Sequence, residues 1–317
     1  PSSIRVGAWM IESGTGVAGV DPRGWALPPG TALRIELPAA DLRDFFTEYY
    51  VLDSDAEVHS GAVSYPLPSW PMIRVALTQG PISLQIGPRC YDPLPVAALY
   101  GTTTRAMQTT THGGITVGLG ITPLGWSRLF PISAEKVRDQ VVPLASLMPA
   151  PAVDALVADL RGADLTTELT TILDSFLRAR LLPPTPNEDA IRGLTNLIND
   201  ERIEDIASAS EQLGLTPAAL RRLSIRFFGY PPKLLLVRAR FMRSLVRMML
   251  AGGDADYTGI APTYFDKSHF LRDARRFLDT TPRRFMQRSN PYVLAVMRAR
   301  RDVASAAHET PSGITVR

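Results

Sequence analysis

Two short segments in the C-terminal third carry closely spaced basic side chains that suit contact with nucleic acid. A guanidinium group can donate two hydrogen bonds to the edge of a guanine, and both Arg and Lys can neutralise a phosphate. The first segment holds Arg221, Arg222 and Arg226, and the second, roughly 45 residues further on, holds Lys267, Arg272, Arg275 and Arg276. Contact with nucleic acid therefore requires helices or strands that place these basic residues on one exposed face.

The first basic segment has the sequence of a helix-turn-helix unit. Apolar and small residues at helical spacing predict a helix over 206–213, which Gly214 can end. Thr216 then caps a second helix, and Pro217 occupies its first position, where proline is tolerated. Inward placement of Leu220 and Leu223 leaves four residues to face outward: Ala218, Arg221, Arg222 and Arg226. An ordinary helical hairpin with a solvated Arg face is the alternative.

The second segment shows the same pattern of a helix cap, buried anchors and an exposed basic face. Asp266 is the expected cap, and Phe270 and Phe277 are expected core anchors seven residues apart. The predicted exposed face consists of Lys267, Ser268, Leu271 and Arg272, with Arg275 and Arg276 adding charge. His269 has no neighbouring partner for metal or acid–base chemistry, so we expect it to pack or to form a hydrogen bond.

A long helix is predicted between the two units, over 231–250, with Val237, Phe241, Leu245 and Met248 on its buried side and Gly252-Gly253 at its end. About 20 helical residues span roughly 30 Å, close to the ~34 Å of one DNA turn. One chain could thus place two helices in successive major grooves.

Residues from about 188 to 288 resemble the DNA-binding domain of AraC/XylS-type transcription regulators. The match rests on Tyr264-Phe-Asp-Lys-Ser-His-Phe-Leu-Arg-Asp-Ala-Arg-Arg-Phe277 and on Thr281-Pro-Arg-Arg-Phe285. The resemblance implies seven helices and a DNA-binding regulator that is more often an activator and would then contact RNA polymerase. It places base contacts on Ala218, Arg221 and Arg222, and on Lys267, Ser268, Leu271 and Arg272. The single cysteine favours a reducing, cytoplasmic setting, and a homodimer is expected from an apolar stripe described below.

The chain departs from the family pattern at three places. Ser224 and Ala274 stand where the family usually has Phe. The supporting helix of the second unit, 256–263, is about two residues short and contains Pro262, which would end a helix early. We therefore expect the first unit to carry most of the base discrimination.

Charge and proline divide the chain at one place. Residues 1–186 carry 13 basic and 17 acidic residues and 20 of the 27 prolines, whereas 221–301 carry 18 basic and 5 acidic residues. This predicts an α+β protein of two domains: a sensory domain over 1–182, a linker over 183–187, an all-helical DNA-binding domain over 188–290, and a C-terminal helix and tail over 291–317.

The first 130 residues are predicted to form a small β-sandwich or cupin-like barrel. Six short strands separated by Pro and Gly turns are expected, at 32–37, 58–65, 72–78, 82–86, 97–101 and 115–121. A helix is expected over 42–50 with Asp41 as its cap. The segment from Gly113 to Trp126, followed by 141–144, resembles the end of cupin-like sensory domains.

Helical periodicity begins after Pro131. A short helix opening with a Ser133 cap and a longer one over 151–160 are predicted. The helix expected over 165–182 has an apolar stripe that includes Leu169 and Leu173. The stripe could pack within the chain, but its position before a stiff linker favours a dimer contact. A last helix is expected around 293–303.

The sequence favours a regulator over two other classes. A cupin-type enzyme needs a His-rich metal site, but His59 and His112 are the only histidines of the first 186 residues and lie in different segments. We expect no catalytic residue, no metal and no cofactor. A purely architectural DNA-binding protein would not need the acidic domain that holds all four tryptophans, where a cavity for a small effector is expected. No segment predicts a signal peptide or a membrane span. No disulfide within the chain is expected, since Cys90 is the only cysteine.

Overall fold

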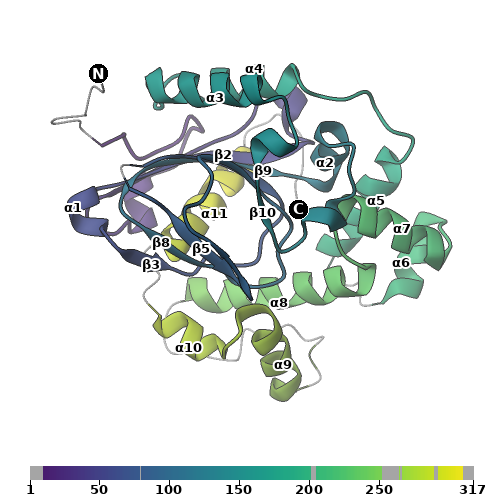
Figure 1. Cartoon of the computed structure of the whole chain (residues 1–317). Coiled ribbons are helices and arrows are strands. Elements are labelled where there is room, and N and C mark those ends of the chain that lie inside the picture. Colours follow the sequence, from purple (N-terminus) through teal and green to yellow (C-terminus); the bar gives the residue numbers. More distant parts are fainter. Residues whose placement is uncertain are drawn as a thin grey trace.

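The chain folds into a β-rich N-terminal part and a helical C-terminal part. The computed structural model describes residues 10–78, 80–200, 205–251, 264, 266–288 and 292–309. Figure 1 shows the strands on one side of the molecule and helices α5 to α10 beside and below them. The predicted α+β fold class is confirmed.

Two antiparallel sheets form the N-terminal part. The six-stranded sheet has the order β1 (Thr31–Glu36), β2 (Phe46–Ser54), β9 (Gly114–Ile121), β4 (Met72–Leu77), β7 (Ala97–Tyr100) and β10 (Val141–Pro143). The four-stranded sheet has the order β3 (Ala62–Ser64), β8 (Gln108–Thr111), β5 (Ser83–Ile86) and β6 (Arg89–Tyr91). Buried side chains of both sheets, such as Met72 and Leu84, share one apolar cluster, so the sheets face each other.

Close approach of a side chain to the backbone explains one glycine of β9. A Cβ atom at Gly118 would lie 2.3 Å from the ring of Tyr50, which lies across this strand. Any larger residue would push Tyr50 away. Glycine here therefore holds the Tyr50 ring on the inner face of the large sheet.

Eleven α-helices lie within the described residues. In the N-terminal part they are α1 (Ala56–His59), α2 (Pro123–Leu129), α3 (Ala150–Gly162) and α4 (Leu169–Arg178), with 3-10 turns η1 (Pro22–Trp25), η2 (Ala40–Leu42), η3 (Ala134–Val137) and η4 (Leu144–Ser146). The others are α5 (Glu188–Asn199), α6 (Ile206–Leu213), α7 (Pro217–Phe228), α8 (Pro232–Ala251), α9 (Lys267–Leu278), α10 (Pro282–Gln287) and α11 (Val293–Glu309).

Two predictions of local structure were wrong. The helix expected over 42–50 is a 3-10 turn followed by β2, and Asp41 lies inside that turn rather than capping it. The aromatic and β-branched residues Tyr49, Tyr50 and Val51 pair with β1 on one side and β9 on the other, and this pairing outweighs local helical spacing. The strand expected over 58–65 is split into α1 and β3.

The predicted dimer role of the 165–182 stripe is not supported. The helix is shorter, Leu169–Arg178, and Leu169, Leu173 and Leu177 are at most 1% exposed because they pack into the main core of their own chain. The stripe is therefore satisfied intramolecularly.

One hydrophobic core runs across the proline-rich segment at 183–187. The cluster that contains Val51 and Leu119 of the large sheet also contains Ile191 of α5 and Phe228 of α7. Ser133 contributes to this junction in an unexpected way: its hydroxyl donates to the carbonyl of Ile225 (3.3 Å) and makes no cap bond to η3. The first helical unit is thus packed onto the N-terminal part.

The last helix returns to the strands. Ala299 and Val303 of α11 are fully buried against Trp25, Leu33 and Ile35, and Figure 1 shows α11 lying across the sheets. None of the described helices is long and apolar enough to span a membrane.

Candidate nucleic-acid interface and cavity

The first helix-turn-helix unit has the local geometry that its sequence predicts. Gly214 ends α6 with φ 59°, in the left-handed region. The Thr216 hydroxyl accepts a hydrogen bond from the Ala219 N–H (3.2 Å), and Pro217 opens α7. Leu220 and Leu223 are buried. This packing fixes which face of α7 is turned to solvent.

That outward face carries the predicted contact residues. All four are exposed: Ala218, Arg221, Arg222 and Arg226. No described acidic side chain pairs with any of these arginines. Arg226 lies 5.4 Å from the ring centre of Phe227, which orients its guanidinium along the helix surface.

The small residue at position 224 is explained by a buried hydrogen-bond network. The Ser224 hydroxyl donates to the Tyr230 carbonyl (2.5 Å) in a fully buried position. The Tyr230 hydroxyl in turn donates to the Asp139 carboxylate (2.5 Å). A Phe at position 224 would displace the turn that ends α7, so the small residue is matched to a contact with the N-terminal part.

The second basic helix, α9, is anchored as predicted. The Asp266 carboxylate accepts from the His269 N–H (2.7 Å) and caps the helix. Phe270 and Phe277 are fully buried, with ring centres 5.4 and 5.2 Å from that of Phe241 in α8. His269 packs on Tyr264 and lies 3.3 Å from Arg240, which confirms its expected packing role.

The outward face of α9 differs from the prediction at one position. Five of its predicted residues are exposed: Lys267, Ser268, Arg272, Arg275 and Arg276. Leu271 is half-buried, because it lies in the same helical turn as the buried anchor Phe270. It therefore exposes less of its side chain than predicted. The supporting segment 256–263, with Pro262, and the glycines 252–253 lie outside the described residues.

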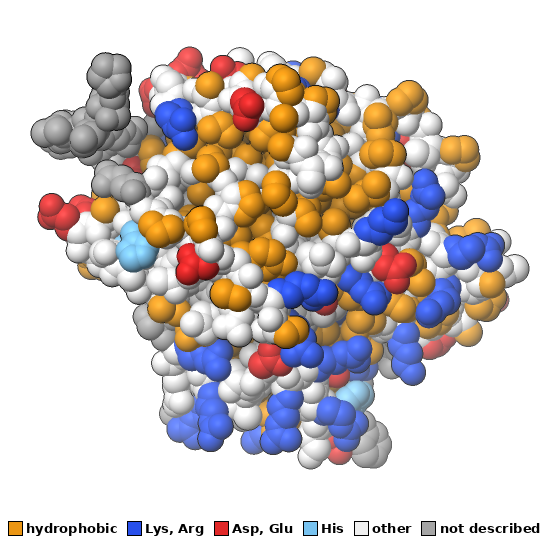
Figure 2. All heavy atoms as spheres, in the orientation of Figure 1, with side chains coloured by type: hydrophobic (Ala, Val, Ile, Leu, Met, Phe, Trp, Pro, Cys, Tyr) orange, Lys and Arg blue, Asp and Glu red, His pale blue; other side chains and the backbone are white. Residues whose placement is uncertain are grey.

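Basic side chains gather on one side of the molecule. Figure 2 shows Lys and Arg concentrated over the lower and right-hand region, where Figure 1 places α7, α8, α9 and α10, whereas Asp and Glu are more frequent toward the opposite edge. A surface of one sign attracts a polyanion and steers its approach.

A cavity of about 550 Å³ lies between the two sheets and is closed by helices of the C-terminal part. Strands β2, β4, β7, β8 and β9 line its floor and walls, and α8 and α11 cover it. Most of its lining is aliphatic or aromatic, including Tyr50, Tyr100 and Met297. Its size and lining suit a small organic molecule.

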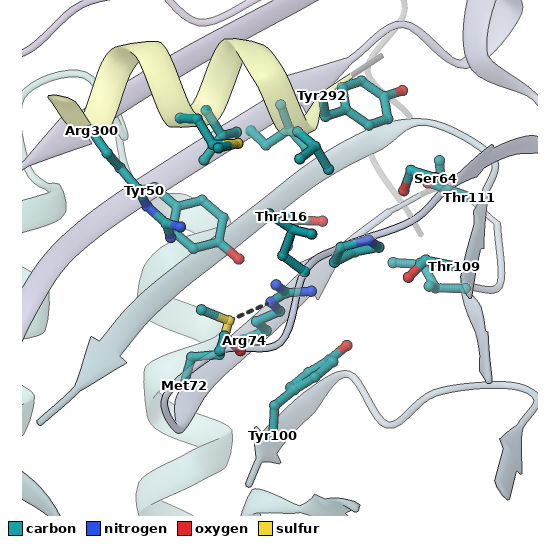
Figure 3. Close-up of a pocket in the computed structure, with 18 of the residues that line it drawn as sticks. Tyr50, Ser64, Met72, Arg74, Tyr100, Thr109, Thr111, Thr116, Tyr292 and Arg300 are labelled. Atoms are coloured by element: carbon teal, nitrogen blue, oxygen red, sulfur yellow. Dashed lines mark hydrogen bonds between the residues drawn. The ribbon is translucent and has the colours of Figure 1, made fainter. Parts of the chain in front are cut away.

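Arg74 is a charged residue of the cavity lining, on strand β4, that was not predicted from the sequence. Figure 3 shows it projecting beneath α11, between Thr116 and Tyr100. Its Nε lies 3.1 Å from the Met72 sulfur, its guanidinium lies 4.5 Å from the centre of the Tyr100 ring, and no carboxylate of the described residues pairs with it. Burial opposes its charge, but the Tyr50 and Tyr100 hydroxyls raise the pKa of Arg74 overall, so it is cationic.

The sequence held one signal for Arg74. Ile73, Val75 and Leu77 alternate along β4 and occupy one face, so Arg74 must point to the other face of a central strand. A buried guanidinium needs a hydrogen-bond or ionic partner, and Arg74 contacts only the Met72 sulfur and the Tyr100 ring, which are weak partners.

The four tryptophans of the N-terminal part do not supply the aromatic lining of the cavity where the structure describes them. Trp25 and Trp126 are fully buried in the cores, and Trp70 packs edge-on against Phe228. Trp9 lies outside the described residues. Tyrosines line the cavity instead.

No group of three or more His, Cys, Asp or Glu side chains in the described part of the chain could hold a metal ion. His59 lies 3.0 Å from the Thr31 hydroxyl, and His112 lies 3.2 Å from the Ser60 hydroxyl, so each has a local hydrogen-bond partner.

Comparisons with known proteins found only distant similarities. No family model and no curated protein matches the chain. Among solved structures, ToxT from Vibrio cholerae (P21 form) has 10% identity and a TM-score of 0.44, over 81% of this chain and 98% of that one. ToxT from Vibrio cholerae O395 has 11% identity and a TM-score of 0.39, over 82% and 98%. The AraC-like transcriptional activator CuxR has 12% identity and a TM-score of 0.24, over 61% and 79%.

Proposed function

We propose that this protein is a sequence-specific DNA-binding transcription regulator that responds to a small effector. The observation that supports it is the pair of capped helices, α7 and α9, each with an exposed basic face and each held on α8. We call α7 and α9 the reading helices. The helix α8 has 20 residues, so it spans roughly 30 Å, a distance that suits two neighbouring major grooves.

We propose that α7 contacts base edges and that the last turn of α9 contacts phosphates, because the exposed residues of each suit these contacts. Arg221 and Arg222 lie on the outward face of α7 next to the small Ala218, which lets the helix approach base edges closely. Arg275 and Arg276 lie in the last turn of α9, where contact with phosphate is expected because only the N-terminal residues of a reading helix commonly reach bases. Activation through RNA polymerase and homodimerisation belong to the same proposal.

The test is binding of the full chain to DNA selected from a random pool. Arg221→Ala or Arg222→Ala should cost about 1–3 kcal/mol on the selected site and much less on random DNA. Arg275→Ala should weaken binding to both DNAs about equally and reduce the salt slope by roughly 1.

The control is Arg23→Ala, which removes an exposed Arg of η1 that already pairs with Asp21 and belongs to neither reading helix. Selected and random DNA bound alike by the unsubstituted protein would favour an architectural protein instead. Absence of DNA binding would contradict both.

The effector is proposed to combine an apolar body with an anionic group. The cavity lining is mostly apolar, and Arg74 supplies a cation without a carboxylate partner among the described residues, whereas Arg300 and Arg301, which also line the cavity, pair with Glu48 and Asp302. Binding of the anionic dye anilinonaphthalene sulfonate should be at least tenfold tighter than binding of the uncharged dye phenylnaphthylamine. Arg74→Met should remove most of that difference, since it keeps the length of the side chain and loses the charge. Equal affinity of both dyes for the unsubstituted protein would contradict an anionic effector.

A further inference from the structure

A seven-residue connection in the N-terminal part touches both helix-turn-helix units. Residues 101–107 join β7 to β8, and both strands line the cavity, through Tyr100 at one end and Thr109 at the other. Thr102 and Thr103 within the connection are fully buried. Any shift of the two strands must therefore move this connection.

One end of the connection is bonded to the second reading helix. The Ala106 N–H donates to the Phe277 carbonyl (2.7 Å), in the last turn of α9, where carbonyl groups have no partner within the helix. Arg105 pairs with Asp279 (2.7 Å), the left-handed residue that ends the same helix. Ala106 and Leu67 also pack against the apolar cluster that contains Phe277.

The other end is bonded to the junction between α7 and α8. The Thr102 carbonyl lies 3.2 Å from the Tyr230 hydroxyl, and the Thr104 N–H donates to Asp139 (2.6 Å), the carboxylate that accepts from the Tyr230 hydroxyl. Tyr230 directly follows Gly229, which ends α7 with φ 84°. One short segment thus contacts the end of each reading helix.

We propose that the 101–107 connection positions the second reading helix against DNA and transmits the state of the cavity to it, with Arg105 as the positioning residue. This rests on the proposed DNA-binding function. The path is short: the cavity-lining strands are joined covalently to the connection, and the connection contacts the C-terminal turn of α9 through the Ala106–Phe277 hydrogen bond and the Arg105–Asp279 ion pair.

The energetics favour a role in orientation over one in stability. Arg105 and Asp279 are 46% and 49% exposed, and ion pairs as exposed as this contribute little to folding. Together with the Ala106–Phe277 bond, however, the pair fixes two points at the end of a helix of 12 residues. A small rotation about that end moves the N-terminal turn, which carries Lys267 and Ser268, across the groove.

The first test measures base preference at the part of the selected site that α9 covers. Arg105→Ala and Asp279→Asn should each lower selectivity there by about threefold to tenfold and leave selectivity under α7 unchanged. Asn is chosen at 279 because it tolerates the left-handed conformation. Arg105→Lys keeps the charge and should retain selectivity, and Arg23→Ala is the matched control for loss of an exposed ion pair. Unchanged selectivity in both Arg105→Ala and Asp279→Asn would overturn the proposal.

The second test measures transmission in the full chain by hydrogen exchange. Saturation with anilinonaphthalene sulfonate should change the exchange rate of the Ala106 amide and of the last turn of α9 by at least threefold, and Arg74→Met should abolish the change. No change in the unsubstituted protein at saturating dye would overturn the transmission. If the unsubstituted protein shows no base preference at all, the proposed DNA-binding function fails first, and the inference fails with it.

Discussion

Three buried tyrosines bonded to carboxylates stabilise the chain at the scale of single residues. The Tyr49 hydroxyl donates to Asp174 (2.7 Å), Tyr230 to Asp139 (2.5 Å) and Tyr264 to Asp273 (2.9 Å). In each case burial first, and then the neighbouring carboxylate, raises the pKa of the phenol above its ordinary value of 10.0. Each neutral phenol is thus favoured in the folded state.

The pH dependence of stability follows from that direction. Because the folded-state pKa values exceed the unfolded ones, the stabilisation is complete below about pH 10 and declines above it as the unfolded chain loses phenolic protons first. We expect the free energy of unfolding, measured with urea at several pH values, to fall steeply above pH 10. Tyr49→Phe should flatten that fall while costing about 1–3 kcal/mol at pH 7, since Asp174 loses its buried donor. An identical alkaline slope in the variant would contradict this account.

Caps and apolar stripes determine the helices at the scale of elements. Asp266, Thr216 and Thr281 each accept a backbone N–H at the start of α9, α7 and α10. Each of these bonds joins residues that are close in sequence, so the caps can be predicted without the rest of the fold.

Removing a cap should loosen one reading helix. Asp266→Ala is expected to cost about 1 kcal/mol of unfolding free energy and to speed hydrogen exchange in the first turn of α9. Asp266→Asn, which keeps the acceptor oxygen, should cost less. Equal losses in the two variants would mean that the charge and not the cap matters.

The stripe of α4 gives an element-scale test of core packing against dimerisation. Leu173 is 1% exposed within its own chain, so Leu173→Ala should cost about 2–5 kcal/mol. Thr171→Ala, at an exposed position of the same helix, should change stability by less than about 0.5 kcal/mol. A Leu173→Ala variant of unchanged stability but altered mass in sedimentation would instead restore the dimer hypothesis.

At the scale of the whole molecule, helix α11 packs against the strands and so joins the helical C-terminal part to the N-terminal part. The helix follows the second unit in sequence, yet Ala299 and Val303 pack against Trp25 and Leu33, and Arg300 pairs with Glu48 (2.7 Å). Other residues of α11 line the cavity together with the strands, so the cavity has walls from both parts of the chain.

Detaching α11 should open that cavity. Val303→Asp places a charge at a 2% exposed position and should lower the unfolding free energy by several kcal/mol, roughly 3 or more, with weaker binding of anilinonaphthalene sulfonate. Ser305→Asp puts the same charge on the exposed face and is the control. Dye binding that survives detachment of α11 would show that the helix is not needed as a wall.

The sequence by itself determined the elements whose signals are local. The α6–α7 unit was predicted from Gly214, Thr216 and Pro217, because a left-handed glycine, a cap and a first-turn proline each act within a few residues. Strands β1, β4 and β9 were predicted for the same reason, from alternation and flanking turns. The basic faces of α7 and α9 followed directly from helical spacing.

Only the tertiary structure decided which surfaces meet. Phe46–Ser54 became a strand because β1 and β9 offer partners on both sides, and these lie far away in sequence. The α4 stripe entered its own core, Arg74 came to face a cavity, and residues 101–107 reached α9. Each outcome depends on contacts between distant segments, whose choice is made by the burial of the whole apolar surface and not by any local preference.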